Sequence, residues 1–170
     1  VYKMKTYDLP DGKVSTMGEY LPGILELDEN EKILYTVVTT DYSGMMLFAF
    51  ENGKMAKVEV KNYATKTNRK KLVGAYSDKS PICDIKFLAE DRDIVAFTDN
   101  NKLLCLNTEK IPLKATKSTQ GVQVITIRKK GAKLSKVMFA EESGIEDLNH
   151  YTSKNIPAAG SFLKKEDSQI

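Results

Sequence analysis

Two stretches rich in lysine and arginine contain the residue types of this chain that are best suited to a function, and that function is the binding of phosphate groups. Thr65–Lys71 reads Thr-Lys-Thr-Asn-Arg-Lys-Lys, and Lys114–Gln120 reads Lys-Ala-Thr-Lys-Ser-Thr-Gln. All of these side chains except alanine donate hydrogen bonds to phosphate oxygens. We call them the first and second basic loops, and Arg128–Lys133, Arg-Lys-Lys-Gly-Ala-Lys, the third basic turn.

The charge of the chain is segregated along its length. The 170 residues carry a net charge of +3, yet residues 54–79 hold 8 basic and 2 acidic residues (+6), and residues 110–136 hold 8 basic and none acidic (+8). Residues 1–53, with 4 basic and 9 acidic residues, are acidic (−5). Clustered cations raise the local potential, so a polyanion-binding surface is expected, although any one loop alone could be a solvated charged loop. The expected binding residues are Lys66, Arg69, Lys70, Lys71, Lys114, Lys117, Arg128, Lys129, Lys130 and Lys133.

The sequence carries no recognisable catalytic or cofactor motif. It has one histidine, His150, which lies in a polar stretch, and it lacks nucleotide-binding glycine loops and metal-ligand spacings. Cys83 and Cys105 lie in apolar runs and are expected to be buried, reduced thiols. Asp91-Arg92-Asp93 is expected to form a solvated turn. We therefore expect no catalytic residue, metal or cofactor here. An enzyme remains an alternative that would need paired carboxylates in one pocket.

The apolar pattern is that of short strands, which predicts an all-β fold. Runs rich in β-branched or aromatic residues are separated by turn signals, and Val122–Ile127 and the start of Met55–Val60 alternate as half-buried strands do. Asn52-Gly53 suits a type I′ hairpin, and Asp99–Lys102 can serve the same purpose. The expected strands are Lys32–Thr40, Met45–Phe50, Met55–Val60, Ile82–Leu88, Ile94–Thr98, Leu103–Leu106 and Val122–Ile127.

The order of these elements repeats. Leu47–Tyr63 and Val95–Ile111, 48 residues later, each read as strand, asparagine-containing turn, lysine and strand, followed by a basic stretch that ends at Gly74 or Gly121. Such a period is typical of propeller-type blades of about four strands. The expected units are 1–30 (partial), 31–81, 82–132 and 133–170 (partial) of one repeat domain. A β-sandwich without true repetition is the alternative.

Together, these motifs resemble the C-terminal domain of the A subunit of bacterial type IIA topoisomerases, DNA gyrase and topoisomerase IV. Met46–Lys54 is similar to the family's strand-turn-strand element, and Tyr63–Leu72 and Lys117–Val122 to its basic, glycine-ended loops. The resemblance implies a β-pinwheel, a propeller variant whose blades exchange strands and which bends duplex DNA around a basic rim. It also implies that the cleaving tyrosine, ATP and Mg²⁺ belong to other regions. The implied partners are duplex DNA, an ATP-hydrolysing B subunit, plus a second A subunit.

The chain departs from the gyrase pattern, because the motif Gln-Arg-Arg-Gly-Gly-Lys-Gly is absent and Thr67–Gly74 and Lys13–Gly18 are its nearest substitutes. Tight wrapping is therefore not implied, and gyrase and topoisomerase IV both stay open. A non-catalytic propeller that binds an acidic protein is the competing function. No apolar run reaches the 18 residues of a membrane span, and Val1 begins a strand-like stretch. We expect a fragment of a longer cytoplasmic, nucleoid-associated protein.

Overall fold

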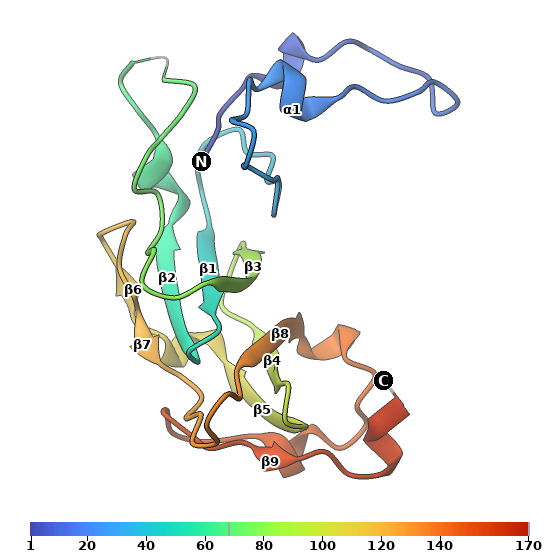
Figure 1. Cartoon of the computed structure of the whole chain (residues 1–170), viewed down its shortest axis with the longest axis vertical. Coiled ribbons are helices and arrows are strands. Elements are labelled where there is room, and N and C mark those ends of the chain that lie inside the picture. Colours follow the sequence, from blue (N-terminus) through green and yellow to red (C-terminus); the bar gives the residue numbers. More distant parts are fainter. Residues whose placement is uncertain (68, 170) are drawn as a thin grey trace.

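The computed structural model describes residues 1–67 and 69–169, and its regular elements are mainly short strands (Figure 1). The strands are β1 (Met45–Phe50), β2 (Lys54–Glu59), β3 (Ile82–Leu88), β4 (Asp93–Thr98), β5 (Lys102–Asn107), β6 (Leu113–Lys114), β7 (Val122–Gln123), β8 (Leu134–Phe139) and β9 (Ser161–Phe162). The helical elements are α1 (Leu21–Ile24) and the 3-10 turns η1 (Thr6–Asp8), η2 (Val60–Tyr63), η3 (Thr108–Lys110), η4 (Ala140–Glu142), η5 (Leu148–Tyr151) and η6 (Glu166–Gln169). The predicted all-β class is confirmed.

The strands form two sheets that exchange segments of the chain. The first sheet has the order β3-β1-β2-β6, with β7 also paired to β2, and the second has the order β8-β4-β5-β9. We call them the first and second blades. The chain leaves the first blade through β3, forms the β4–β5 hairpin of the second, and returns to β2 through β6 and β7. This exchange of strands is the property expected of a β-pinwheel.

The two blades have matching strand registers. Ala49 of β1 pairs with Asp84 of β3, and Phe97 of β4, 48 positions after Ala49, pairs with Lys136 of β8. Both ladders shift register immediately after this pair. The repeat found in the sequence therefore reproduces details of strand pairing as well as the order of elements.

The hairpin turns differ from the predicted type I′ form. Three residues rather than two join β1 to β2, and the backbone N–H of Gly53 donates to the carbonyl of Phe50. A type I′ turn needs positive φ at two central residues, whereas in this loop only Gly53 has one (φ 83°). The second hairpin has Asn101 at the equivalent position (φ 60°), where asparagine tolerates the left-handed conformation.

The largest apolar cluster lies between the blades. It combines side chains of the first blade, such as Leu47 and Met55, with side chains of the second, such as Ile94 and Leu104. The outer face of each blade has a cluster of its own, around Phe48 in the first and around Tyr151 in the second. Strand β2 is buried on both faces, contrary to its predicted half-buried pattern, because it lies between two of these clusters.

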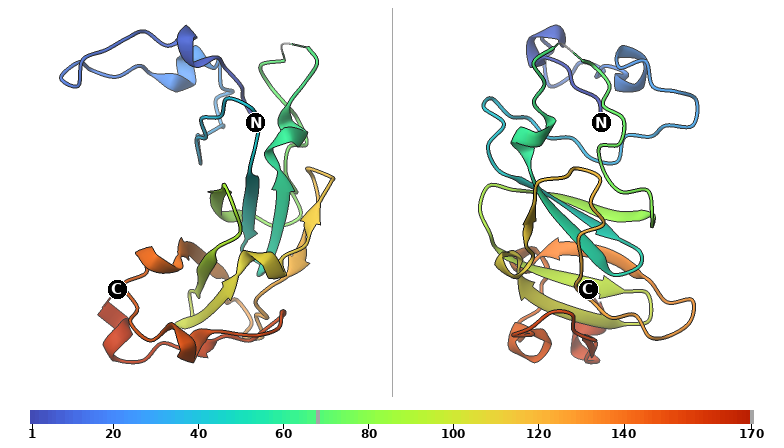
Figure 2. Two further views of the ribbon diagram at one scale, coloured as in Figure 1. Left: turned by 180° about the vertical axis from the view of Figure 1, so that it is seen from behind. Right: turned by 90° about the vertical axis from the view of Figure 1, so that its left-hand side faces the viewer.

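Residues 1–44 lie at the end of the molecule away from the second blade (Figure 2). The predicted strand Lys32–Thr40 is not formed. The Tyr35 hydroxyl accepts from the backbone N–H of Phe87 on β3, the edge strand of the first blade, but no strand pairing joins the two segments in the part of the chain that the structure describes. An isolated antiparallel β-bridge pairs Tyr2 of the N-terminal segment with Lys71. Val122–Ile127 is likewise shorter than predicted, with pairing limited to β7 and a bridge from Ile125 to Ala158.

Candidate nucleic-acid interface

The first two basic loops emerge at the same end of the first blade. The first follows η2, directly after the C-terminal end of β2. The second follows β6, which runs parallel to β2 with Val58 opposite Lys114, so it leaves the sheet at the same end. In Figure 1 these loops, green and gold, lie beyond the same ends of β2 and β6. Strand exchange thus brings together segments about 48 residues apart in sequence.

The second basic loop contacts η2 and β2, the elements that lead into the first basic loop. The ammonium of Lys117 lies 5.8 Å from the ring centre of Tyr63, a cation–π arrangement. The Tyr63 hydroxyl donates to the carbonyl of Ala75 at 2.7 Å, which fixes the ring at the base of the first loop. Burial raises the pKa of Tyr63, so its ring stays neutral. Lys54 on β2 donates to the Gln120 side chain at 3.0 Å.

A close backbone approach sets the end of the second basic loop. Gly121 has a φ of 69°, and a Cβ on it would lie 1.8 Å from the carbonyl oxygen of Met55. No other residue fits there, because such a contact would push the loop away from β2. The Thr119 hydroxyl accepts a hydrogen bond from the Gly121 N–H at 3.1 Å and fixes the turn before it.

The cations of these loops differ in how free they are to bind an anion. Lys66, Arg69 and Lys70 are exposed, and within residues 1–67 and 69–169 no ion pair engages them. Lys114 and Lys117 are half-buried. These five side chains form a group of available positive charges, which we call the loop cations.

Lys71, in contrast, is already paired. Its ammonium lies 2.7 Å from Asp28 and 3.0 Å from Glu31, and it lies over the ring of Tyr2. Hydrogen bonds to Asp28, Tyr2 and Glu31 raise the pKa of Lys71. The Tyr2 hydroxyl donates to Glu31, and this bond, together with those from the Asp28 backbone and Lys71, lowers the pKa of Glu31 to about 2. The acidic N-terminal segment thus contacts the first basic loop.

The third basic turn lies at the other end of the blades. Lys133 pairs with Glu51 in the β1–β2 turn at 2.9 Å, and its backbone N–H donates to Asp99 in the β4–β5 turn. The hydrogen bond to Glu51 raises the pKa of Lys133. Arg128, Lys129 and Lys130, beside it, are exposed. The structure therefore does not bring this turn together with the two basic loops.

Two further lysines, which the sequence patterns do not single out, contact the loops. Lys54 holds Gln120, as described above. Lys3 donates to the Thr65 hydroxyl at 2.6 Å, and its backbone N–H donates to the carbonyl of Lys70. Lys54 lies in the +6 segment, where charge could indicate it, whereas Lys3 lies in an acidic segment and carries no such signal.

Other sequence expectations are corrected by the structure. Asp91, Arg92 and Asp93 are exposed as expected, and Asp91 also accepts hydrogen bonds from Lys57 and Thr108, which make it part of a polar contact between the blades. Cys105 is buried as expected, but Cys83 is only half-buried, and burial raises its pKa to about 12. Among the residues described, no three His, Cys, Asp or Glu side chains are grouped to hold a metal ion. The described helices are all too short to cross a membrane.

Comparisons by sequence and by structure both find proteins described as DNA gyrase or DNA topoisomerase IV. No family model matches the chain. The DNA gyrase A subunit of Borrelia hermsii (strain HS1 / DAH) is 22% identical over 130 residues, which are 75% of this chain and 16% of that protein. A crystal structure of the C-terminal domain of DNA topoisomerase IV superposes with a TM-score of 0.65 at 22% identity, covering 78% of this chain and 42% of that one.

The fold is that of the C-terminal domain of the topoisomerase A subunit. The gyrase A C-terminal domain superposes with a TM-score of 0.57 at 19% identity, over 82% of this chain and 44% of that one. The E. coli ParC C-terminal domain gives 0.62 at 14% identity, over 89% and 68%. The resemblance stated from the sequence motifs, including the β-pinwheel, is confirmed. The chain spans about a sixth of the curated gyrase protein, and both gyrase and topoisomerase IV domains are similar to it.

Proposed function

We propose that this chain binds and bends duplex DNA as the C-terminal domain of a type IIA topoisomerase A subunit. The observation that carries the proposal is the convergence of the two basic loops at one end of the first blade, with Lys117 lying over Tyr63. A duplex presents regularly spaced phosphates, so several weak cationic contacts in a row act together. The loop cations, Lys66, Arg69, Lys70, Lys114 and Lys117, supply such a row.

The composition of the loops favours duplex over single-stranded DNA. Readers of single strands stack bases on exposed aromatic rings. At this interface, Tyr63 is buried and its hydroxyl is bonded to Ala75. The contacts offered here are those of phosphate binding, which carry no base sequence. The affinity is therefore expected to be nearly independent of DNA sequence.

Arg128, Lys129, Lys130 and Lys133 remain proposed DNA contacts of a second kind. They lie at the other end of the blades, so a duplex on the basic loops would reach them only by bending across the blades. In the whole enzyme, this domain would act beside a catalytic region that cleaves DNA. The other partners would be an ATPase B subunit, which uses ATP and Mg²⁺, together with a second A subunit.

Two measurements test the proposal. Fluorescence anisotropy with 40-base-pair duplexes of unrelated sequence should give equal affinities that fall steeply with salt. Energy transfer between dyes at the two ends of a 60-base-pair duplex should rise when the chain binds, since bending shortens the distance between them. No binding to any duplex, together with binding to an acidic polypeptide such as polyglutamate, would favour the interaction propeller instead.

A further inference from the structure

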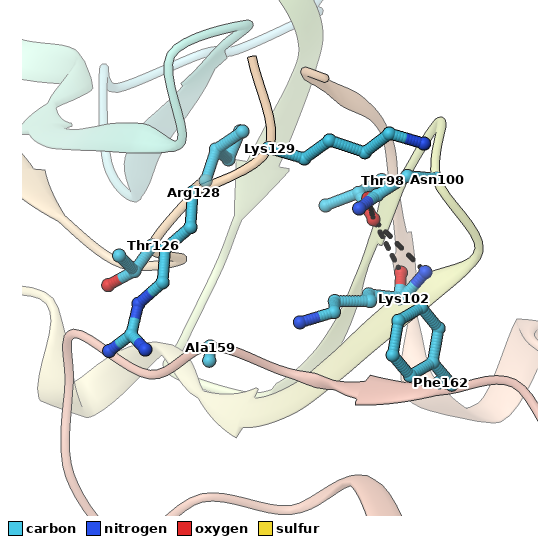
Figure 3. Close-up of a pocket in the computed structure, with 9 residues that line it drawn as sticks. Thr98, Asn100, Lys102, Thr126, Arg128, Lys129, Ala159 and Phe162 are labelled. Carbon is cyan, nitrogen blue, oxygen red and sulfur yellow. Dashed lines mark hydrogen bonds between the residues drawn. The ribbon is translucent and has the colours of Figure 1, made fainter. Parts of the chain in front are cut away.

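A pocket of about 200 Å³ lies in the second blade, away from the basic loops (Figure 3). One side is formed by the β4–β5 turn and Lys102 on β5, and the facing side by residues 126–129. Ala159 and Phe162, around and on β9, complete the lining. The pocket is therefore bounded by segments that strand exchange brings to the edge of the second blade.

The pocket is strongly cationic. Lys102, Arg128 and Lys129 line it, and no carboxylate does. No ion pair engages these three side chains in the part of the chain that the structure describes. In Figure 3, the ends of Lys102 and Arg128 lie on either side of Ala159. Three uncompensated positive charges around a small hollow favour a ligand with at least two negative charges.

Hydrogen bonds and strand pairing hold one wall in place. Lys102 pairs with Phe162 across β5 and β9, and its ammonium lies 4.9 Å from the centre of that ring. The Thr98 hydroxyl accepts from the backbone N–H of Lys102 at 3.1 Å and donates to the Asn100 side chain at 2.6 Å. A site built on strands and fixed turns loses little entropy when it binds a ligand.

The pocket also presents apolar surface beside its charges. Phe162 is 64% exposed, although it is a large aromatic side chain, and Ile127 is half-buried. A cationic site flanked by an aromatic ring suits a ligand that joins a phosphate to a flat ring. The volume is below the range of about 300–1,000 Å³ that is usual for drug-sized ligands. It therefore fits one small unit rather than a length of duplex.

We propose that this pocket binds a single nucleotide unit, with its phosphate held by Lys102, Arg128 and Lys129 and its ring against Phe162. Such a unit could be a free nucleotide or one residue of an unpaired DNA strand. This pocket lies away from the first and second basic loops, so it does not depend on duplex binding there, although Arg128 and Lys129 also belong to the proposed second set of duplex contacts.

The test compares ligands that carry one or both parts of the unit. Titrations of the isotope-labelled 170-residue chain, followed by two-dimensional NMR, would use dTMP, thymidine and pyrophosphate. We expect dTMP to shift the amide signals of residues 126–129 and 161–163 and to bind more tightly than thymidine or pyrophosphate. Decathymidylate then distinguishes a free nucleotide from a residue of a DNA strand as the ligand. A pocket for a DNA strand should bind decathymidylate more tightly than dTMP, whereas a pocket for free nucleotides should not.

A pair of matched variants localises the effect. Arg128→Gln with Lys129→Gln should weaken dTMP binding by about tenfold, the loss of about 1.4 kcal/mol. Arg69→Gln with Lys70→Gln removes the same charge at the other end and should leave dTMP binding unchanged. The proposal is overturned if dTMP shifts none of the pocket signals, if pyrophosphate binds as tightly as dTMP, or if both variants weaken dTMP binding equally.

Discussion

The ammonium of Lys57 lies 2.6 Å from Oδ1 of Asp91 and joins the two blades through a buried charge. Lys57, on β2 of the first blade, is 3% exposed, and it also donates to the carbonyl of Thr108 at 2.9 Å. Asp91 lies in the connection from β3 to β4, and it accepts the Thr108 hydroxyl at 2.7 Å. The side chain of Asp91 is 33% exposed, so only the lysine is fully withdrawn from water.

Asp91→Asn should destabilise the chain by about 2 kcal/mol. Removal of one partner of a buried ion pair costs roughly 3–5 kcal/mol because the other charge is left uncompensated, and the partial exposure of Asp91 reduces that figure. Urea unfolding would measure it. Glu90→Gln, at the exposed neighbouring position, is the control and should change stability by less than about 0.5 kcal/mol. Equal stabilities of the two variants would contradict the role of this contact.

The Lys57–Asp91 pair also predicts that the stability of the chain depends on pH in the acidic range. Burial opposes ionisation of Asp91, but the hydrogen bonds from Lys57 and Thr108 and the charge of Lys57 outweigh it, so its pKa lies below the usual 3.8. A lowered folded-state pKa stabilises the fold above the unfolded-state pKa, and this stabilisation is lost as the pH falls. The difference in unfolding free energy between wild type and Asp91→Asn should be constant above about pH 5 and shrink below about pH 4. A difference that persists unchanged to pH 2 would mean that the charge of Asp91 is not responsible.

Gly121→Ala should destabilise the second basic loop far more than Gly74→Ala. Both glycines have positive φ, 69° and 63°, so both substitutions incur the backbone cost of about 1 kcal/mol. A Cβ at Gly74 has no heavy atom within 4 Å, whereas at Gly121 it would collide with Met55. We expect a total loss of more than about 2 kcal/mol for Gly121→Ala in thermal or urea unfolding. Similar losses at the two positions would show that the loop can move away from β2 at little cost.

Much of this fold can be predicted from sequence, because β1 to β5 have clear local patterns. Strand β8, Leu-Ser-Lys-Val-Met-Phe, escapes prediction, since its residues do not alternate in polarity. The predicted strand Lys32–Thr40 is wrong although its pattern is favourable, because its backbone does not pair with β3, the edge strand that Tyr35 contacts. A strand forms where a neighbouring strand can make hydrogen bonds to its backbone groups, and a single sequence does not show which segment will be that neighbour.

The candidate site is predictable in its residue types and only partly in its geometry. Equivalent positions in consecutive repeats correctly place the first and second basic loops together. The third basic turn has the same signal of charge, yet it lies at the other end of the blades, since β7 runs antiparallel to β2 and carries the chain away from the loops. The pairing of Lys71 with Asp28 and Glu31 joins segments about 40 residues apart and leaves no pattern in the sequence.

Release of Lys71 from the acidic segment should strengthen DNA binding. Asp28→Asn with Glu31→Gln removes both carboxylates that hold Lys71 and makes its ammonium available for a phosphate. Duplex affinity at low salt should rise several-fold, and the slope of log affinity against log salt should steepen by about 0.9, the contribution of one phosphate contact. Glu26→Gln with Glu29→Gln changes the net charge equally in the same segment and is the control. If both double variants raise affinity alike, net charge rather than Lys71 accounts for the gain.

The salt dependence of duplex binding by two triple variants tests the central claim most directly. One variant replaces Lys66, Arg69 and Lys70 of the first basic loop with alanine, and the other replaces Lys79, Lys154 and Lys165, three exposed lysines outside the basic loops. Fluorescence anisotropy across a salt series should show that the first variant binds every duplex more weakly, with a slope flattened by about two to three units, while the second changes little. Equal losses of affinity and slope in the two variants would contradict a defined interface on the basic loops.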